Sequence, residues 1–217
     1  MALQDFTIRW YDMTIDGLDG KFVVCKLRRV SSPPVLVGSV SNSLESSFQR
    51  LVDIIRLGKE SRNYRDLRAV EWWLKEDFGN DAETEWAEYE RVICRSLGVE
   101  RLESLRPRMH PPSSAPPPHL AVAFHKATMN DRPYLVGRVG SILGSPAPEL
   151  LTHPHERNSA LDRLRNVFRI GVRGQTFRDF VEAGRKLGMS EADIVGEWRR
   201  CERQVLSTMT QQDCIRQ

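Results

Sequence analysis

The sequence has few cysteines, and none of them stands in an arrangement typical of a metal site or a redox pair. The four cysteines are Cys25, Cys94, Cys201 and Cys214, and they show neither a Cys-x-x-Cys spacing nor a nearby histidine of the kind a zinc site needs. We therefore expect free thiols in a reducing compartment, either cytoplasmic or nuclear, and no metal or other cofactor.

Long apolar runs and catalytic motifs are also missing from the sequence. No stretch approaches the roughly 18 uncharged apolar residues that a membrane span requires. Asp5 precedes any apolar run, so no secretory signal is expected. A Gly-rich phosphate loop, a Gly-x-Ser-x-Gly elbow and a His-Glu-x-x-His motif are all absent. These absences favour an intracellular binding protein with no membrane partner over an enzyme.

Charge is unevenly distributed along the 217 residues, although the net charge is only +3. Residues 1–100 hold 14 basic and 17 acidic side chains, whereas residues 101–217 hold 18 basic and 12 acidic ones. An acidic half therefore precedes a basic half. The basic half is the better candidate for binding a polyanion.

A seven-residue pattern, Glu-Trp-x-x-x-Glu-Arg, occurs at residues 85–91 and again at residues 197–203. The match extends backwards at a nearly constant offset: Arg50-Leu51 and Arg163-Leu164 lie 113 residues apart, as do the Arg-Asp pairs at 65–66 and 178–179. Small shifts in the offset fall in expected loops. The sequence therefore predicts a tandem duplication of one α+β unit.

Each unit is expected to begin with a short antiparallel sheet of two or three strands. Residues 6–11 alternate in polarity, residues 16–20 contain the aspartates and glycines of a turn, and residues 22–27 are mostly apolar. This pattern predicts a β-hairpin. Residues 35–40 can add an edge strand after two prolines. In the second unit, residues 121–124 and 134–139 correspond to the hairpin strands.

Three helices are expected to follow the strands in each unit. Asn42 and Glu45 have the spacing of a capping box, which predicts a helix that ends at Gly58. Apolar periodicity then predicts helices over residues 64–78 and 82–97. The shorter spacing between Asp179 and Gly188 makes the middle helix of the second unit about one turn shorter.

A proline-rich segment separates the two units and holds six of the twelve prolines. Such a segment favours an extended spacer. We therefore divide the chain into an acidic repeat at 1–99, a linker at 100–119, a basic repeat at 120–209 and a C-terminal tail at 210–217. A proline-rich ligand for an aromatic groove is the alternative interpretation of the linker.

The repeated residues have two interpretations, as a buried structural motif or as a binding signature used twice. The tryptophans lie on apolar helix stripes, which favours packing, and the charged residues can form ion pairs between the second and third helices of each copy. The repeated structural motif comprises Arg65, Asp66, Glu85, Trp86, Glu90, Arg91, Arg178, Asp179, Glu197, Trp198, Glu202 and Arg203.

Basic side chains on the hairpins and in the second repeat are the candidate nucleic-acid site. A sheet that presents cations beside aromatic residues such as Phe22 or Tyr134 can hold phosphates and stack bases. A Leu-Gly-x-Ser turn at 187–190 also allows, less favourably, a helix-turn-helix interpretation. The candidate residues are Lys26, Arg28, Arg29, Arg138, Arg163, Arg169, Arg173, Arg185, Lys186, Arg199 and Arg200.

The sequence thus predicts a non-enzymatic, intracellular binding protein. Nucleic-acid binding, to DNA or RNA, through the basic second repeat in a regulatory or antagonist role is the first hypothesis. A protein-interaction or assembly module, built from a pseudo-symmetric pair of repeats that bind a protein partner or self-associate, is the alternative.

Overall fold

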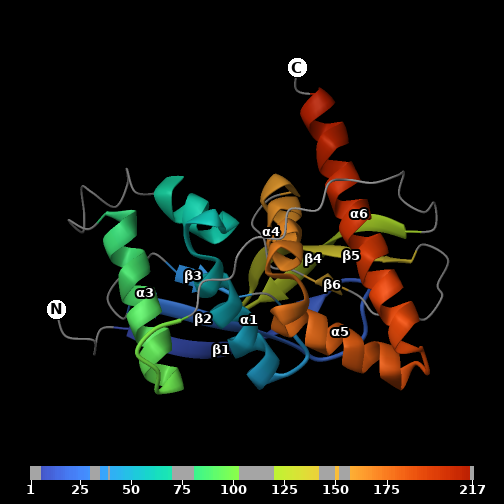
Figure 1. Cartoon of the computed structure of the whole chain (residues 1–217). Coiled ribbons are helices and arrows are strands. Elements are labelled where there is room, and N and C mark those ends of the chain that lie inside the picture. Colours follow the sequence, from blue (N-terminus) through green and yellow to red (C-terminus); the bar gives the residue numbers. More distant parts are fainter. Residues whose placement is uncertain are drawn as a thin grey trace.

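The computed structural model describes residues 6–29, 35–38, 40–69, 81–102, 120–141, 150–151 and 157–215. We call residues 6–102 the first half and residues 120–215 the second half. The fold is mixed α+β: the strands form one antiparallel sheet, and the helices gather on one side of it (Figure 1). None of the helices among the described residues is long and apolar enough to cross a membrane.

The first half contains a β-hairpin, a short edge strand and helices. The elements are β1 (Phe6–Ile15), β2 (Phe22–Arg29), β3 (Val35–Val37), α1 (Leu44–Leu57), the 3-10 turn η2 (Gly58–Glu60), helical residues 62–69 and α3 (Ala82–Leu97). The hairpin and the short third strand confirm the sequence prediction. The rest of the helix predicted to residue 78 lies outside the described residues, as does most of the linker.

The second half contains the same order of elements. They are β4 (Leu120–Met129), β5 (Arg132–Ser141), β6 (Leu150–Leu151), α4 (Arg157–Ile170), the 3-10 turn η3 (Gly171–Arg173), α5 (Gln175–Lys186) and α6 (Glu191–Ile215). Residues 210–215 of the predicted C-terminal tail are helical and continue α6.

Helix and strand ends follow local sequence signals. At the tip of the β4–β5 hairpin, Asn130 and Asp131 adopt φ of 49° and 57°, which a tight two-residue turn requires. Helix α1 begins one residue later than the capping box predicts, because Ser43, rather than Asn42, accepts the N–H of Ser46. Helix α3 has the predicted bounds, with Asp81 as N-cap and Gly98 in the left-handed conformation that ends helices.

The two sets of strands join into a single six-stranded sheet with the order β3-β2-β1-β4-β5-β6. The halves meet where the ends of β1 and β4 overlap, with Thr14 opposite Thr128 and Ile15 opposite Ala127. The sequence predicted a sheet in each unit but gave no indication that the two sheets are continuous.

Three apolar clusters form the core of the part of the chain that the structure describes. The first packs β1 and β2 against α1 and α3, and the second packs β4 and β5 against α4, α5 and α6. The third cluster joins Met13, Ile15 and Val24 of the first half to Ala127, Met129 and Val136 of the second. In β2, Leu27 belongs to the first cluster and Val24 to the third. Because strand side chains alternate, the third cluster lies on the sheet face turned away from the helices.

Candidate nucleic-acid interface

The sheet face turned away from the helices, called the second face below, carries basic and aromatic side chains. The alternation of side chains along each strand and the register between the strands assign its positions. Among the described positions of this face there is no aspartate or glutamate; they are Thr7, Arg9, Tyr11, Met13, Ile15, Phe22, Val24, Lys26, Arg28, Ala123, His125, Ala127, Met129, Arg132, Tyr134, Val136 and Arg138.

Two of the basic residues on this face stand directly opposite each other, because β1 and β2 pair Arg9 with Lys26. Like charges in this position destabilise a sheet. No described carboxylate lies within 4.0 Å of the charged groups of Arg9, Lys26, Arg28 or Arg132. Arg9 and Arg132 are exposed, whereas Lys26 and Arg28 are half-buried. Around these four residues the face therefore concentrates positive charge that no described carboxylate neutralises.

Lys26 is held between aromatic rings from both halves. Its Nζ atom lies 4.7 Å from the ring centroid of Tyr11 and 5.4 Å from that of Tyr134, and it donates a 3.4 Å hydrogen bond to the Tyr134 hydroxyl. Burial lowers the pKa of Lys26, and the charges of Arg132 and Arg28 lower it further. The ammonium group thus stands in a cationic environment at the junction of the two hairpins.

Most of the other residues predicted to bind nucleic acid lie away from Lys26 and Arg28. Arg185 and Lys186 form exposed ion pairs with Glu191 and Glu182, and Arg200 pairs with Glu197. Arg169 donates to the backbone oxygen of Glu60 at 2.7 Å. Arg173 and Arg199 are exposed, Arg138 is half-buried on the second face, and the side chain of Arg29 lies outside the described residues. The helical cations therefore do not share the second face with Lys26 and Arg28.

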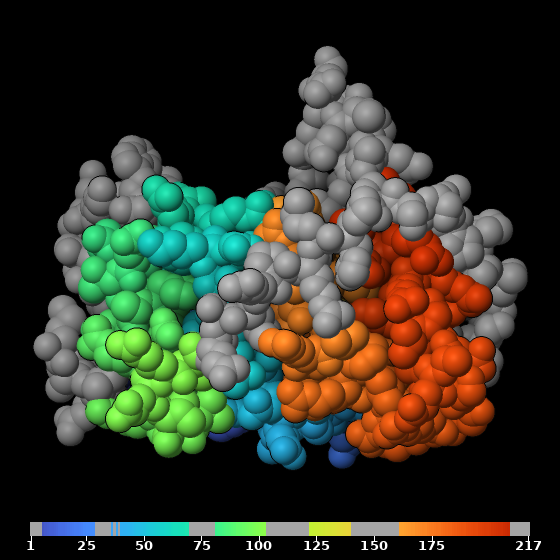
Figure 2. Space-filling model, in the orientation of Figure 1, coloured from blue at the N-terminus to red at the C-terminus, as the bar shows by residue number. Residues whose placement is uncertain are grey.

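Arg163 is buried at the contact between the halves and does not belong to an exposed basic surface. Its Nη2 atom lies 2.7 Å from Asp66 Oδ2, across the contact between α4 and helical residues 62–69. In the same way, Arg50 of α1 donates to Asp179 of α5 at 2.8 Å. Arg50 and Arg163 are 113 residues apart, as are Asp66 and Asp179, so the two ion pairs are reciprocal. Figure 2 shows the helical side, where the halves abut.

We call this contact, between α1 with residues 62–69 and α4 with α5, the seam. Its ion pairs differ from the predicted ones, since Asp66 and Asp179 reach across to the other half. Burial lowers the pKa of Arg50 and of Arg163, and the carboxylate opposite each arginine opposes that shift. Buried ion pairs of this kind contribute little net stability relative to apolar side chains of similar volume, because desolvation offsets the attraction between the charges.

At the seam, a side chain of each half caps the N-terminus of a helix in the other half. Asp53 Oδ2 accepts the backbone N–H of Gln175, the first residue of α5, at 2.7 Å. Asn166 Oδ1 accepts the backbone N–H of Arg62, which begins the helical residues 62–69, at 3.3 Å. Asp53 and Asn166 again lie 113 residues apart. Because Gly174 offers α5 no side-chain cap, the first half supplies that cap.

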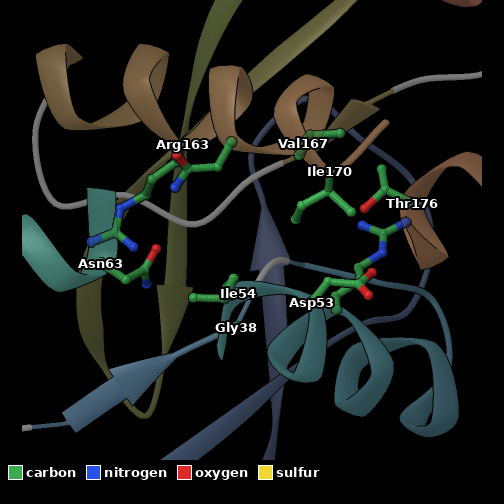
Figure 3. A pocket seen from close by; sticks show the side chains of 10 residues that line it. Gly38, Asp53, Ile54, Asn63, Arg163, Val167, Ile170 and Thr176 are labelled. Carbon is green, nitrogen blue, oxygen red and sulfur yellow. The ribbon is translucent and has the colours of Figure 1, made fainter. Parts of the chain in front are cut away.

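A small cavity lies inside the seam. Arg163 and Asn63 line one end, and Asp53 and Thr176 line the other (Figure 3). Its volume of about 10 Å³ has room for about one water molecule and no larger ligand. Desolvation raises the pKa of Asp53 to about 6, although the Gln175 N–H and Arg56 oppose the shift. The seam is thus a polar structural contact that cannot hold a substrate in this conformation.

The repeated motif contributes buried helix residues. Trp86 is 6% exposed and packs edge-to-face on Tyr64 and Tyr89, while Trp198 is 4% exposed and contacts Phe168, Phe177 and Phe180. Glu85 and Glu197 are buried beside them. Arg91 pairs with Glu88 on its own helix.

The remaining motif charges lie near the seam or on the surface. Arg65 lies 3.8 Å from Asp162 of α4, which also accepts from Arg62. Arg178 donates to the backbone oxygen of Arg173. Glu90, Glu202 and Arg203 are half-buried on α3 and α6.

The described cysteines form no disulfide, and no described residues form a metal site. Cys25, Cys94 and Cys201 are buried free thiols, and burial raises the pKa of Cys25 and of Cys201 to about 12. The described residues contain no group of three histidines, cysteines or carboxylates that could hold a metal ion.

Sequence reasoning missed Arg9 and Arg132 as members of the cationic face. The alternation of residues 6–11 puts Arg9 and Tyr11 on one face of the strand, so the position of Arg9 could have been predicted from this alternation alone. Arg132 comes near Lys26 only because the two hairpins meet, which no local pattern indicates. Comparison with known proteins gives no guide to either residue: no protein-family model, curated protein or solved structure matches the chain.

Proposed function

We propose that the protein binds nucleic acid through the second face of its sheet, and that it acts by binding rather than by catalysis. The contact surface comprises Arg9, Lys26, Arg28, Arg132 and Arg138. Both halves contribute to it, so the site differs from the basic second half that charge distribution alone favours. Its aromatic neighbours, Tyr11 and Tyr134, are residue types that sheet-based nucleic-acid modules use.

The Arg9–Lys26 pair is the observation that carries the proposal. Opposed like charges cost a sheet a few tenths of a kcal/mol to about 1 kcal/mol relative to a neutral pair. Here the pair is joined by Arg28 and Arg132, and no described carboxylate neutralises any of the four. Phosphate groups would remove this repulsion when bound, and they would release counterions as well.

We also propose that the chain arose by tandem duplication and that its halves form a pseudo-dimer. Both halves share one order of elements, and both pairs of seam contacts are reciprocal at the same 113-residue spacing. Reciprocity of this kind is the property of a two-fold interface between identical subunits. A duplication would therefore place the second face of the sheet on the pseudo-two-fold axis.

Fluorescence anisotropy with labelled single-stranded DNA, duplex DNA and RNA tests the binding function. We expect binding at 25 mM salt that weakens steeply by 200 mM, because each phosphate contact contributes about 0.7–0.9 to the logarithmic salt slope. The double variant Arg9→Gln/Arg28→Gln should lower that slope by about 2.

The matched control is Arg185→Gln/Lys186→Gln, which removes two positive charges from exposed, ion-paired positions of α5. We expect the control to bind like the wild type. Absence of binding at low salt, or an equal loss in the control, would contradict the assignment of the second face.

A free strand edge supports protein binding as a second candidate. β1 pairs with β4 only at residues 14–15, so no described strand pairs with that edge along residues 6–12. A groove of about 250 Å³ runs between this edge and α3, lined by Phe6, Ile8, Val92, Arg95 and Ser96. An extended peptide could add as a strand here, with an acidic residue against Arg95.

Amide chemical shifts in the presence of a peptide alternating valine and glutamate test this second candidate. Shifts centred on residues 6–12 that disappear in Ile8→Lys would support it. Shifts elsewhere, or none, would argue against it.

A further inference from the structure

We infer that Lys26 is the centre of a phosphate-binding subsite at the junction of the two hairpins. This deepens the proposed function, on which it rests, by naming the group that binds and the residues that hold it. The phosphate can belong to a nucleic-acid backbone or to a free polyphosphate.

The subsite has a fixed ammonium group at its centre. The Tyr11 and Tyr134 rings lie within 5.4 Å of Nζ, and the Tyr134 hydroxyl accepts one of its three protons. The two rings come from different halves, so the position of the ammonium depends on how the hairpins meet. A cation held in this way loses little side-chain entropy when an anion binds.

Three arginines occupy positions near this centre on the same face, and the charges of two of them, Arg28 and Arg132, act on Lys26. Arg9 is opposite Lys26 in the β1–β2 register, Arg28 is two residues along the same face, and Arg132 is close enough to lower the pKa of Lys26. The Nε atom of Arg28 is shielded from solvent and has no hydrogen-bond acceptor among the described residues. A buried donor without an acceptor is costly, and because this atom is shielded, an anion would reach it only after the Arg28 side chain moves.

Phosphate fits this arrangement better than a carboxylate does. A phosphate carries more than one negative charge in its terminal form and presents three acceptor oxygens, so it can contact an ammonium and two guanidinium groups together. A carboxylate presents two oxygens and neutralises one charge. Each backbone phosphodiester also carries one charge and two non-bridging oxygens, but a nucleic acid brings several such groups close together, which a single carboxylate cannot do. The four cations therefore exceed the charge of any single phosphate, and adjacent phosphates of a polyphosphate or a nucleic-acid backbone would together neutralise them.

The test measures the affinity of the full-length chain for sodium tripolyphosphate and for a 20-residue oligothymidylate, by calorimetry and competition. We compare Lys26→Gln with Lys126→Gln, which removes a lysine from the opposite face of the same sheet. For the wild type we expect tripolyphosphate to compete with the oligonucleotide. In Lys26→Gln both affinities should fall about tenfold, the value of one charge-assisted hydrogen bond, with no change in Lys126→Gln.

Two further measurements separate binding from folding. Lys26→Met keeps the packing of the side-chain stem and should show the same tenfold loss, while its unfolding midpoint should match that of Lys26→Gln. By linkage, bound tripolyphosphate should raise the pKa of the Lys26 amine, observed by NMR of ε-labelled lysine.

The outcomes distinguish the subsite from the proposed function. Oligonucleotide binding that is unchanged in Lys26→Gln and Lys26→Met would overturn the subsite while leaving nucleic-acid binding intact. Tripolyphosphate binding that depends on Lys26, without oligonucleotide binding, would support the subsite and overturn the proposed function. Binding of neither ligand would overturn both.

Discussion

Replacing Asp53 by asparagine removes one buried carboxylate from the seam while keeping an oxygen that can accept the Gln175 N–H. The other half already has this chemistry, because Asn166 caps Arg62 at the equivalent position. Asp53 is 3% exposed, and the positive groups that face it are Arg50 and Arg56 on its own helix and Arg178 on α5. These groups offset its desolvation only in part, which is why the pKa of Asp53 is raised.

The sign of the effect follows from this shift. In the folded protein the pKa of Asp53 is about 6, against an ordinary value of 3.8, so the folded state holds the proton more tightly than the unfolded state. The contribution of Asp53 to the free energy of unfolding therefore falls as pH rises from about 4 to about 6, and this contribution is constant outside that window. At 1.36 kcal/mol per pKa unit, the cost of the ionised carboxylate is about 3 kcal/mol at pH 7.

Urea unfolding at pH values from 4 to 8 measures the effect as a difference between variant and wild type. Other titrating groups are common to both proteins and cancel. We expect Asp53→Asn and the wild type to be nearly equal in free energy of unfolding at pH 4. The variant should gain up to about 3 kcal/mol at pH 7, with unchanged m values.

Asn166→Asp provides the reverse experiment at the other cap, and it should destabilise the protein more at pH 7 than at pH 4. The reasoning would be refuted by a difference between Asp53→Asn and wild type that does not change with pH. The reasoning would also be refuted if the free energy of unfolding of the wild type rose relative to that of Asp53→Asn as pH increases, since the carboxylate would then be stabilising.

Three other predictions concern the seam, the packing of the second half and the buried thiols. Arg163→Ala should cost about 1–3 kcal/mol, the value of a hydrogen bond to a charged group, because Asp66 loses this partner but keeps Arg62. A double-mutant cycle with Asp66→Ala should give a coupling above the value for the exposed Arg185–Glu191 pair, about 0.5 kcal/mol. Gly184→Ala should destabilise by about 1–3 kcal/mol, because a Cβ there would lie 2.6 Å from Ile194 Cγ1; Gly196→Ala, with nothing within 4 Å, should instead stabilise α6 in thermal unfolding. A thiol reagent at pH 8 should leave Cys25 and Cys201 unmodified until urea unfolds the chain, because burial raises each pKa to about 12; rapid labelling of either thiol in the folded protein would contradict this.

Elements with strong local signals were predictable from the sequence. Helix α3 has the predicted bounds because Asp81, Gly98 and a regular apolar stripe all agree. The β1–β2 hairpin was equally accessible, since alternation and a glycine-rich turn fix it. At α1 the two candidate caps, Asn42 and Ser43, are adjacent polar residues, and sequence spacing alone favoured the wrong one.

The contacts between the halves could not be predicted in the same way. The repeated Arg-Asp pairs were evident at constant spacing, but spacing cannot tell whether Asp66 faces an arginine of its own half or of the other half. An ion pair within one half and an ion pair between the halves involve the same residue types at the same offset in the sequence. Only the three-dimensional arrangement distinguishes Arg163–Asp66 from a contact within one half.

The two halves are in contact on both sides of the sheet. On the second face, the third apolar cluster brings Val24 and Val136 together and thereby sets Lys26 beside Tyr134. On the helical side, the buried ion pairs and cross-half caps contribute little net stability but admit one register, because any slip would leave buried charges unpaired. The geometry of the proposed phosphate subsite therefore depends on the seam, although no seam residue contacts it. Arg50→Ala should accordingly weaken oligonucleotide binding even where the protein remains folded, whereas breaking the exposed Arg185–Glu191 pair should not.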